Sequence, residues 1–193
     1  MHHIYHTEGI ILGSKNFGEA GKYYHIFTRD LGMVVASAQG VRKMASKLRF
    51  ILQDFSYVKV DLVRGRDFWR VTSASKADSL EDLKKNPEAF QVFSSISLLL
   101  KRLLSGEEPN KALFDDLARG LSILEKTNAG GDVRNIEAVI VLRILANLGY
   151  IGGNPAIESI AKSPFEENLV FEAARSRMNI LKEINKAIRA ADL

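Results

Sequence analysis

The hydrophobic pattern of this 193-residue chain changes its period once, near residue 80, and this change constrains the fold more than any other feature. Before it, short apolar or alternating segments are separated by turn sequences rich in Gly, Asp and Asn, which is typical of strands. These segments are residues 5–14, 22–28, 33–39, 55–63 and 69–75. After it, apolar residues recur every three or four positions, as in amphipathic helices. The sequence therefore predicts an α+β chain, with a β module at residues 1–80 and an all-α domain at residues 81–193.

The five predicted strands are too few for a β-sandwich and suit a small closed barrel. Between the third and fourth strands, residues 40–49 are long enough to form a helix or a long loop. A five-stranded Greek-key barrel commonly carries its helix or long loop at this connection, and the pattern is that of the oligonucleotide-binding (OB) fold. We expect Tyr24 or Phe27 to lie in the core of this barrel.

The second part predicts four helices, at residues 87–104, 111–127, 133–148 and 167–190. Residues 133–148 are apolar around most of the helix circumference, which is typical of a central helix in a bundle. The last helix is predicted to bury one stripe that includes Phe171 and Met178. Residues 152–155 (GGNP) are predicted as a turn.

The excess positive charge is concentrated in the first part of the chain. The formal net charge is +4, and residues 1–80 contain 12 Lys and Arg against 7 Asp and Glu, whereas the remainder contains 15 against 16. A polyanion is therefore the expected partner of the barrel.

The composition also excludes several classes of protein. The chain has no cysteine, which rules out disulfides, a thiol nucleophile and a cysteine-ligated zinc site. No apolar run is long enough to span a bilayer, and the first residues do not resemble a secretory signal, so we expect a cytoplasmic protein without membrane contact. The four histidines have no acidic or sulfur ligands clustered with them, and no catalytic motif is found. We therefore predict no metal, no cofactor, no catalytic residue and no enzymatic activity.

Residues 40–49 (GVRKMASKLR) hold four cations and no acid. Such a segment favours phosphate binding because neutralised phosphates release their counterions, although a solvated surface loop has the same composition. Further cations flank the first and last barrel loops, which OB folds use to bind oligonucleotides together with the face between them. Aromatic side chains of the barrel can stack on bases or fill the core, and the pair Phe68–Trp69 is the better stacking candidate. The predicted nucleic-acid-binding residues are Lys15, Lys22, Arg29, Arg42, Lys43, Lys47, Arg49, Arg64, Arg66, Arg70 and Trp69.

The order of these segments resembles the RecO family of bacterial DNA-repair recombination mediators. The resemblance covers residues 5–12 (YHTEGIIL), 16–20 (NFGEA), 27–32 (FTRDLG), 40–43 (GVRK), 46–49 (SKLR), 52–56 (LQDFS) and 63–66 (VRGR), and more sparsely residues 142–151 (LRILANLGYI). Many members carry a four-cysteine zinc site after that last segment. Here residues 154–163 replace its first half without a cysteine, and the chain looks short at its C-terminal end.

The resemblance implies a protein that binds single- and double-stranded DNA and anneals complementary strands. It also implies partnership with RecR and with the C-terminal tail of single-stranded-DNA-binding protein (SSB), loading of the recombinase RecA at gaps, and a nucleoid-associated location. The helical domain would then supply a groove for the acidic, apolar tail, and Lys101, Arg102 or Arg143 could contact its carboxylates. An OB-fold RNA- or ribosome-binding protein with a helical dimerisation domain is the main alternative. A metal-dependent nuclease is a third, but its potential ligands Glu19, Asp30 and Asp67 are scattered.

Overall fold

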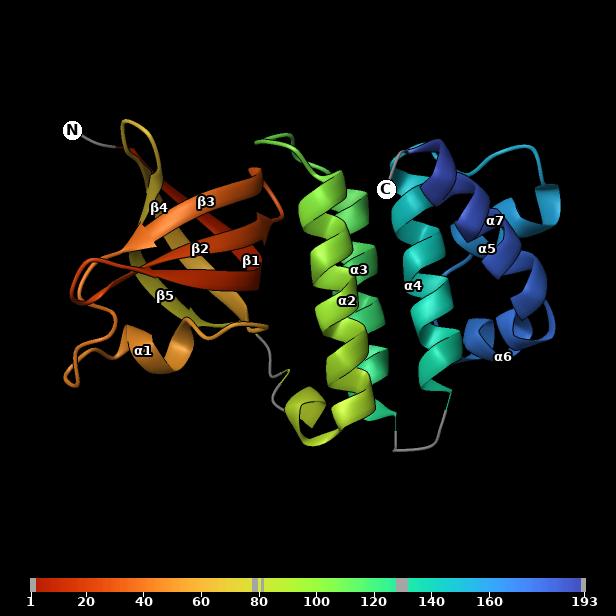
Figure 1. The fold of residues 1–193 in the computed structure, drawn as a ribbon, viewed down its shortest axis with the longest axis horizontal. Coiled ribbons are helices and arrows are strands. Elements are labelled where there is room, and N and C mark those ends of the chain that lie inside the picture. The colour runs from red at the N-terminus through yellow and green to blue at the C-terminus, as the bar shows by residue number, and fades with distance from the viewer. Residues whose placement is uncertain (1–2, 78–79, 81, 128–131, 192–193) are drawn as a thin grey trace. The chain divides into compact units, whose positions relative to one another are not determined.

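The computed structural model describes residues 3–77, 80, 82–127 and 132–191 (Figure 1). The chain divides into two compact units. The first unit consists of Met1–Glu81 and Phe93–Lys111, and the second of Asp82–Val92 and Ala112–Leu193. Helix α2 (Pro87–Leu103) therefore contributes its first residues to the second unit and the rest to the first.

The first unit contains a closed five-stranded barrel with the strand order β1-β2-β3-β5-β4. Its strands are β1 (Ile4–Phe17), β2 (Gly21–Thr28), β3 (Gly32–Ala38), β4 (Tyr57–Arg64) and β5 (Trp69–Lys76). All neighbouring strands are antiparallel except β3 and β5, which close the barrel in parallel through the pairs Ala36↔Trp69 and Ser37↔Arg70. The predicted five-stranded OB barrel is thus confirmed, with strand ends shifted by up to three residues.

Strand β1 is longer than predicted because it serves two neighbours. Its first half pairs with β4 and its second half with β2, and the β1–β2 register shifts between Ile11 and Gly13. Gly13 adopts a φ of 148°, which lets the strand bend at this irregularity. The bend allows one strand to line two sides of a small barrel.

The barrel core is formed by the inward side chains of all five strands. Tyr24 is fully buried in this core, which confirms the expectation that Tyr24 or Phe27 lies there, whereas Phe27 is fully buried outside this cluster. The short helix α1 (Leu48–Ile51) follows β3, and its Leu48 and Ile51 pack against the same core.

Residues 93–111 belong to the first unit and contact the barrel at several points. The Phe93 ring centroid lies 5.1 Å from that of Phe55, and the backbone N–H of Met33 donates to the Gly106 carbonyl at 3.1 Å. Gly32, with a φ of 71°, approaches the Glu108 backbone so closely that a Cβ atom would lie 2.5 Å from its carbonyl oxygen. This part of the barrel surface is therefore covered by the chain itself.

The second unit is helical. It contains a 3₁₀ turn η1 (Asp82–Lys85), the start of α2, α3 (Lys111–Lys126) from Ala112 onward, α4 (Val133–Asn147), α5 (Pro155–Lys162), α6 (Glu167–Arg175) and α7 (Arg177–Ala190). Helix α4 contacts α5, α6 and α7, and buried residues occur around most of its circumference. The prediction that this helix is central is confirmed.

Two predictions about the C-terminal helices are wrong. Residues 167–190 form two helices that break at Ser176, not one. The buried stripe is also displaced from the predicted one: Phe171 is 63% and Met178 77% exposed, while Ala173 and Ile180 are buried. Helix α5 was not expected: the Asn154 side chain accepts a hydrogen bond from the Ile157 N–H, and Pro155 occupies the first helical position.

Candidate nucleic-acid interface

A row of outward side chains crosses four strands of the barrel. The pairing register places Lys15 beside Tyr23, Tyr23 beside Ser37, and Ser37 beside Arg70. These residues face outward because their strand neighbours Tyr24, Ala36 and Trp69 are buried in the core. The row therefore has an exposed cation on each side of an aromatic ring.

Tyr23 is the centre of an aromatic cluster that we call the aromatic row: Phe17, Tyr23 and Phe68. The Phe17 and Tyr23 rings stack with centroids 4.3 Å apart, and the Phe68 centroid lies 4.9 Å from that of Tyr23. Phe68 is 45% exposed. The aromatic row joins the end of β1 to the β4–β5 connection, so it lies between the two loops that OB folds use for oligonucleotides.

The β4–β5 connection depends on Gly65. Its N–H donates to the Phe68 carbonyl at 3.0 Å, and a Cβ atom at this position would lie 2.3 Å from the Phe68 carbonyl oxygen. Glycine is therefore required for this tight turn. The turn leaves Arg66, Phe68 and Arg70 exposed beside the aromatic row.

The basic segment, residues 40–49, is attached to the β1–β2 loop. The Arg42 N–H donates to the Ala20 carbonyl at 3.0 Å, and its guanidinium donates to the Gly18 carbonyl at 3.4 Å. Lys43 and Lys47 are exposed on the same segment. The backbone contact thus brings the basic segment next to the loop that follows Phe17.

Three predicted cations have other surroundings. Arg64 forms an ion pair with Glu107, so any phosphate there would compete with a carboxylate already in place. Lys22 lies on the inward side of β2, 3.3 Å from the Ser14 hydroxyl and 6.0 Å from the centre of the Tyr24 ring. Arg29 follows β2 at the end opposite to the β1–β2 loop, about 26 Å from that loop along the eight-residue strand. The remaining predicted cations form two groups: Lys15, Arg66 and Arg70 lie beside the aromatic row, and Arg42, Lys43, Lys47 and Arg49 lie on the basic segment, which Arg42 joins to the β1–β2 loop.

Trp69 is a correction to the predicted base-stacking residues. It is 4% exposed, and its ring meets that of Tyr5 edge-on at 5.1 Å inside the barrel. The reason is that Trp69 pairs with the inward-facing Ala36 where the barrel closes. Phe68, one residue earlier, faces outward, and the nucleic-acid-binding residues predicted from the sequence include neither Phe17 nor Tyr23. The burial of Tyr24 is the signal that points Tyr23 outward, since alternate strand residues face opposite sides.

Arg143 is a second correction, since it is buried rather than available to a partner. It is 6% exposed, and its guanidinium donates to Asp116 Oδ1 at 2.7 Å and to the Ser163 carbonyl at 2.6 Å. The guanidinium carbon also lies 5.2 Å from the centre of the Phe165 ring. Arg143 therefore links α4 to α3 and to the end of α5, within the second unit.

Lys101 and Arg102 lie in the part of α2 that belongs to the first unit. Lys101 is half-buried, and its Nζ would lie 3.5 Å from a Cβ placed on Gly13. Burial lowers the pKa of His25 on the neighbouring strand, and the charge of Lys101 lowers it further. Arg102 is exposed.

The described residues contain no group of three or more His, Asp or Glu that could hold a metal ion. The four-cysteine zinc site that the resemblance raises does not fit this chain, which has no cysteine and forms helix α5 where the first half of that site is expected. Within the same described ranges, no helix is long and apolar enough to cross a membrane.

A closed five-stranded barrel followed by a helical bundle defines the class of OB-fold proteins with an α-helical C-terminal part. The comparisons place the chain within that class. Residues 1–80 match the model of the recombination protein O N-terminal region, and residues 80–151 match that of its C-terminal region. The chain belongs to the RecO family.

Curated relatives of the chain are named DNA repair protein RecO. The chain is 33% identical over 147 residues to the DNA repair protein RecO of Rubrobacter xylanophilus and 30% identical over 147 residues to that of Pelotomaculum thermopropionicum. Each alignment covers 76% of this chain, but 58% and 56% of the relatives, so the matched part spans little more than half of their length. The RecO of Caldanaerobacter subterraneus subsp. tengcongensis is 24% identical over 96% of this chain and 73% of the relative.

Proposed function

We propose that this protein is a non-enzymatic recombination mediator in DNA repair that binds single- and double-stranded DNA and anneals complementary strands. The observation that carries the proposal is the aromatic row, with exposed cations on both sides of it and on the adjoining basic segment. Rings can stack on unpaired bases of any sequence, and the cations can neutralise phosphates. In this proposal residues 1–80 form the DNA-binding domain and residues 81–193 the helical domain.

Annealing follows from the same chemistry. Two complementary strands repel each other through their phosphates, and this repulsion is strongest at low salt. A surface that neutralises phosphates of both strands lowers the barrier to their encounter, and stacking without hydrogen-bond readout leaves the base edges free to pair. The proposed activity therefore needs no nucleotide hydrolysis, metal or cofactor.

The proposed protein partners are RecR and the acidic C-terminal tail of SSB, the proposed role includes helping to load RecA at SSB-coated gaps, and the proposed location is the nucleoid in the cytoplasm. The family resemblance supports these proposals. Of the three cations predicted for the SSB tail, Arg102 is the exposed one. Arg102→Glu is expected to weaken binding of a labelled tail peptide in fluorescence anisotropy, and unchanged binding would remove Arg102 from the proposed tail site.

The first experiment is annealing of two complementary labelled oligonucleotides in a salt series, with and without SSB. We expect fast annealing that falls as salt rises and that persists on SSB-coated strands. Salt-dependent binding without annealing would contradict the mediator proposal and favour a general nucleic-acid-binding barrel. In that case a competition in which RNA displaces DNA would support the RNA-binding alternative.

The second experiment reverses the charge of the basic segment with Arg42→Glu, Lys43→Glu, Lys47→Glu and Arg49→Glu in one chain. Each phosphate contact on a single strand contributes about 0.7 to the slope of log K against log salt, so losing four lowers its magnitude by about 3. A matched control reverses four exposed cations of the second unit, Arg119, Lys126, Arg175 and Lys182. An unchanged slope in a folded basic-segment variant would exclude this segment from the DNA-binding surface.

A further inference from the structure

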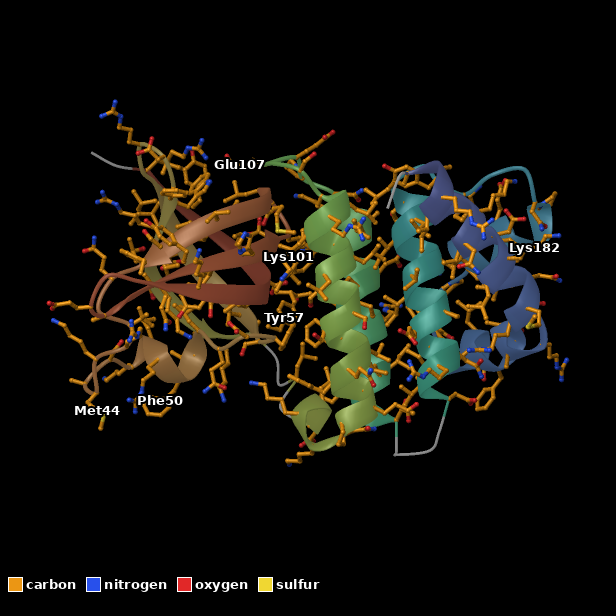
Figure 2. All side chains as sticks on the ribbon, in the orientation of Figure 1. Met44, Phe50, Tyr57, Lys101, Glu107 and Lys182 are labelled. Atoms are coloured by element: carbon orange, nitrogen blue, oxygen red, sulfur yellow. The ribbon has the colours of Figure 1, made fainter. Side chains whose placement is uncertain are left out.

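Two large apolar side chains stand exposed within and next to the basic segment. Met44 is 83% and Phe50 58% exposed, and both project away from the barrel (Figure 2). Other apolar residues of the same stretch, Val41, Leu48 and Ile51, pack against the barrel core. The chain therefore uses part of the apolar surface of this segment for folding and leaves Met44 and Phe50 outside.

Arg49 connects the two exposed side chains. Its guanidinium carbon lies 4.7 Å from the centre of the Phe50 ring, and its Nη1 donates to the Met44 sulfur at 3.3 Å. We call Met44, Arg49 and Phe50 the platform. A ring, a planar guanidinium and a polarisable thioether are side chains that contact the flat faces of unpaired bases or insert between them.

We propose that the platform binds unpaired bases of a single DNA strand and extends the single-strand path that starts at the aromatic row. The path is continuous, because Arg42 is hydrogen-bonded to the β1–β2 loop that follows Phe17, and the platform lies a few residues further along the same segment. Residues 40–53 contain four cations and no acid, so every charged side chain of this stretch is positive. Lys43 and Lys47 contact the phosphates while the platform contacts the bases.

The platform distinguishes single strands from duplexes. Bases in a duplex are already stacked and paired, so their faces are closed to Phe50, whereas the phosphates remain open to the lysines. The inference rests on the proposed DNA-binding function and adds a specificity to it. The cations bind the phosphates of single-stranded and double-stranded DNA, whereas the platform binds only unpaired bases.

The test measures binding of the full chain to a single-stranded oligonucleotide and to a duplex of the same length by fluorescence anisotropy. Met44→Ala/Phe50→Ala is expected to lower single-strand affinity about fivefold or more while duplex affinity changes by less than about twofold. Phe50→Trp restores stacking and is expected to keep wild-type affinity. The matched control is Phe171→Ala/Met178→Ala, which removes two comparably exposed side chains from the second unit.

A second readout follows stacking directly. An oligonucleotide carrying 2-aminopurine is expected to lose fluorescence on binding to the wild-type chain at the positions that meet the platform, and to keep more of it with Phe50→Ala. Equal losses of affinity for single strands and duplexes would overturn the proposal, as would wild-type affinity for both. An effect of Met44→Ala/Phe50→Ala confined to an acidic, apolar peptide would also overturn it and identify a peptide site.

These outcomes are separable from failure of the proposed function. If the wild-type chain binds neither form of DNA, the proposed function itself fails. If the wild-type chain binds DNA and the platform variant binds it equally well, only the platform assignment fails.

Discussion

Replacing Arg143 by Met is expected to destabilise the second unit, because the methionine cannot replace the contacts of the buried guanidinium. Met is apolar and comparably long, so the main loss is the charge and its hydrogen bonds to Asp116 and the Ser163 carbonyl. Asp116 would retain its hydrogen bond from Asn147 at 3.0 Å but would lose its ion pair with Arg143. Removing one partner of a buried ion pair costs about 3–5 kcal/mol.

The lower end of that range applies here, because the Asp116 side chain is 21% exposed and water can replace part of the lost interaction. A loss of about 3 kcal/mol in a helical unit of this size lowers the melting temperature by roughly 12–24 °C. Circular dichroism at 222 nm on the full chain follows this transition, since the second unit holds most of the helices.

A double variant tests whether the uncompensated charge of Asp116 causes the loss of stability. Arg143→Met/Asp116→Leu removes both charges, so it is expected to be more stable than Arg143→Met alone, because no uncompensated carboxylate remains. A melting temperature of Arg143→Met within about 2 °C of the wild type would refute the structural role of the pair. Loss of SSB-tail binding in a variant of unchanged stability would instead restore Arg143 as a partner-binding residue.

Four further predictions concern single positions. Gly120→Ala is expected to destabilise the second unit by about 1–3 kcal/mol despite the better helix propensity of Ala, because the new Cβ would lie 2.7 Å from Ile140 Cγ1; urea unfolding measures this. Because the pKa of His25 is lowered in the folded chain, the unfolded chain binds the proton more readily below pH 6.5, so stability should fall as pH decreases through that range. Lys101→Met should raise the pKa of His25 in an NMR titration, and an unmoved pKa would show that burial alone lowers it. Gly65→Ala is expected to weaken oligonucleotide binding with little change in the melting temperature, because the β4–β5 turn must open to admit a Cβ. Unchanged affinity for the oligonucleotide would exclude this turn from the interface.

The sequence predicted the barrel because its signals are local. Turn residues and alternation of period two identify strands one at a time, and five short strands leave few architectures. The direction of Trp69 was not predictable in the same way, because it depends on pairing with Ala36, a residue 33 positions earlier in the chain. Phe68 and Trp69 are adjacent, so the strand register decides which of the two side chains faces the core. A shift of one residue in that register would exchange the core face with the binding face.

In the helical part, too, features that depend on distant residues could not be predicted from the sequence. The break at Ser176 carries no Gly or Pro, so the period of residues 167–190 reads as one helix although the structure holds two. Arg143 looked like an available cation because its partner Asp116 is 27 residues away in the chain and on another helix. The cations of the basic segment were predicted from composition, whereas the exposure of Met44 and Phe50 follows from which side of that segment faces the core.

The parallel junction that closes the barrel has a consequence for how the protein opens. The β3–β5 ladder consists of two residue pairs, whereas the β2–β3 ladder has seven, so local unfolding is expected to start at the short ladder. Ser37 and Arg70 of that ladder lie in the same outward row as Tyr23. A strand of DNA bound across this row would hold β2, β3 and β5 together and would add its binding free energy to the free energy of opening. Bound DNA would then keep the barrel closed for as long as it stays bound, which would be measured as slower hydrogen exchange at the amides of β3 and β5.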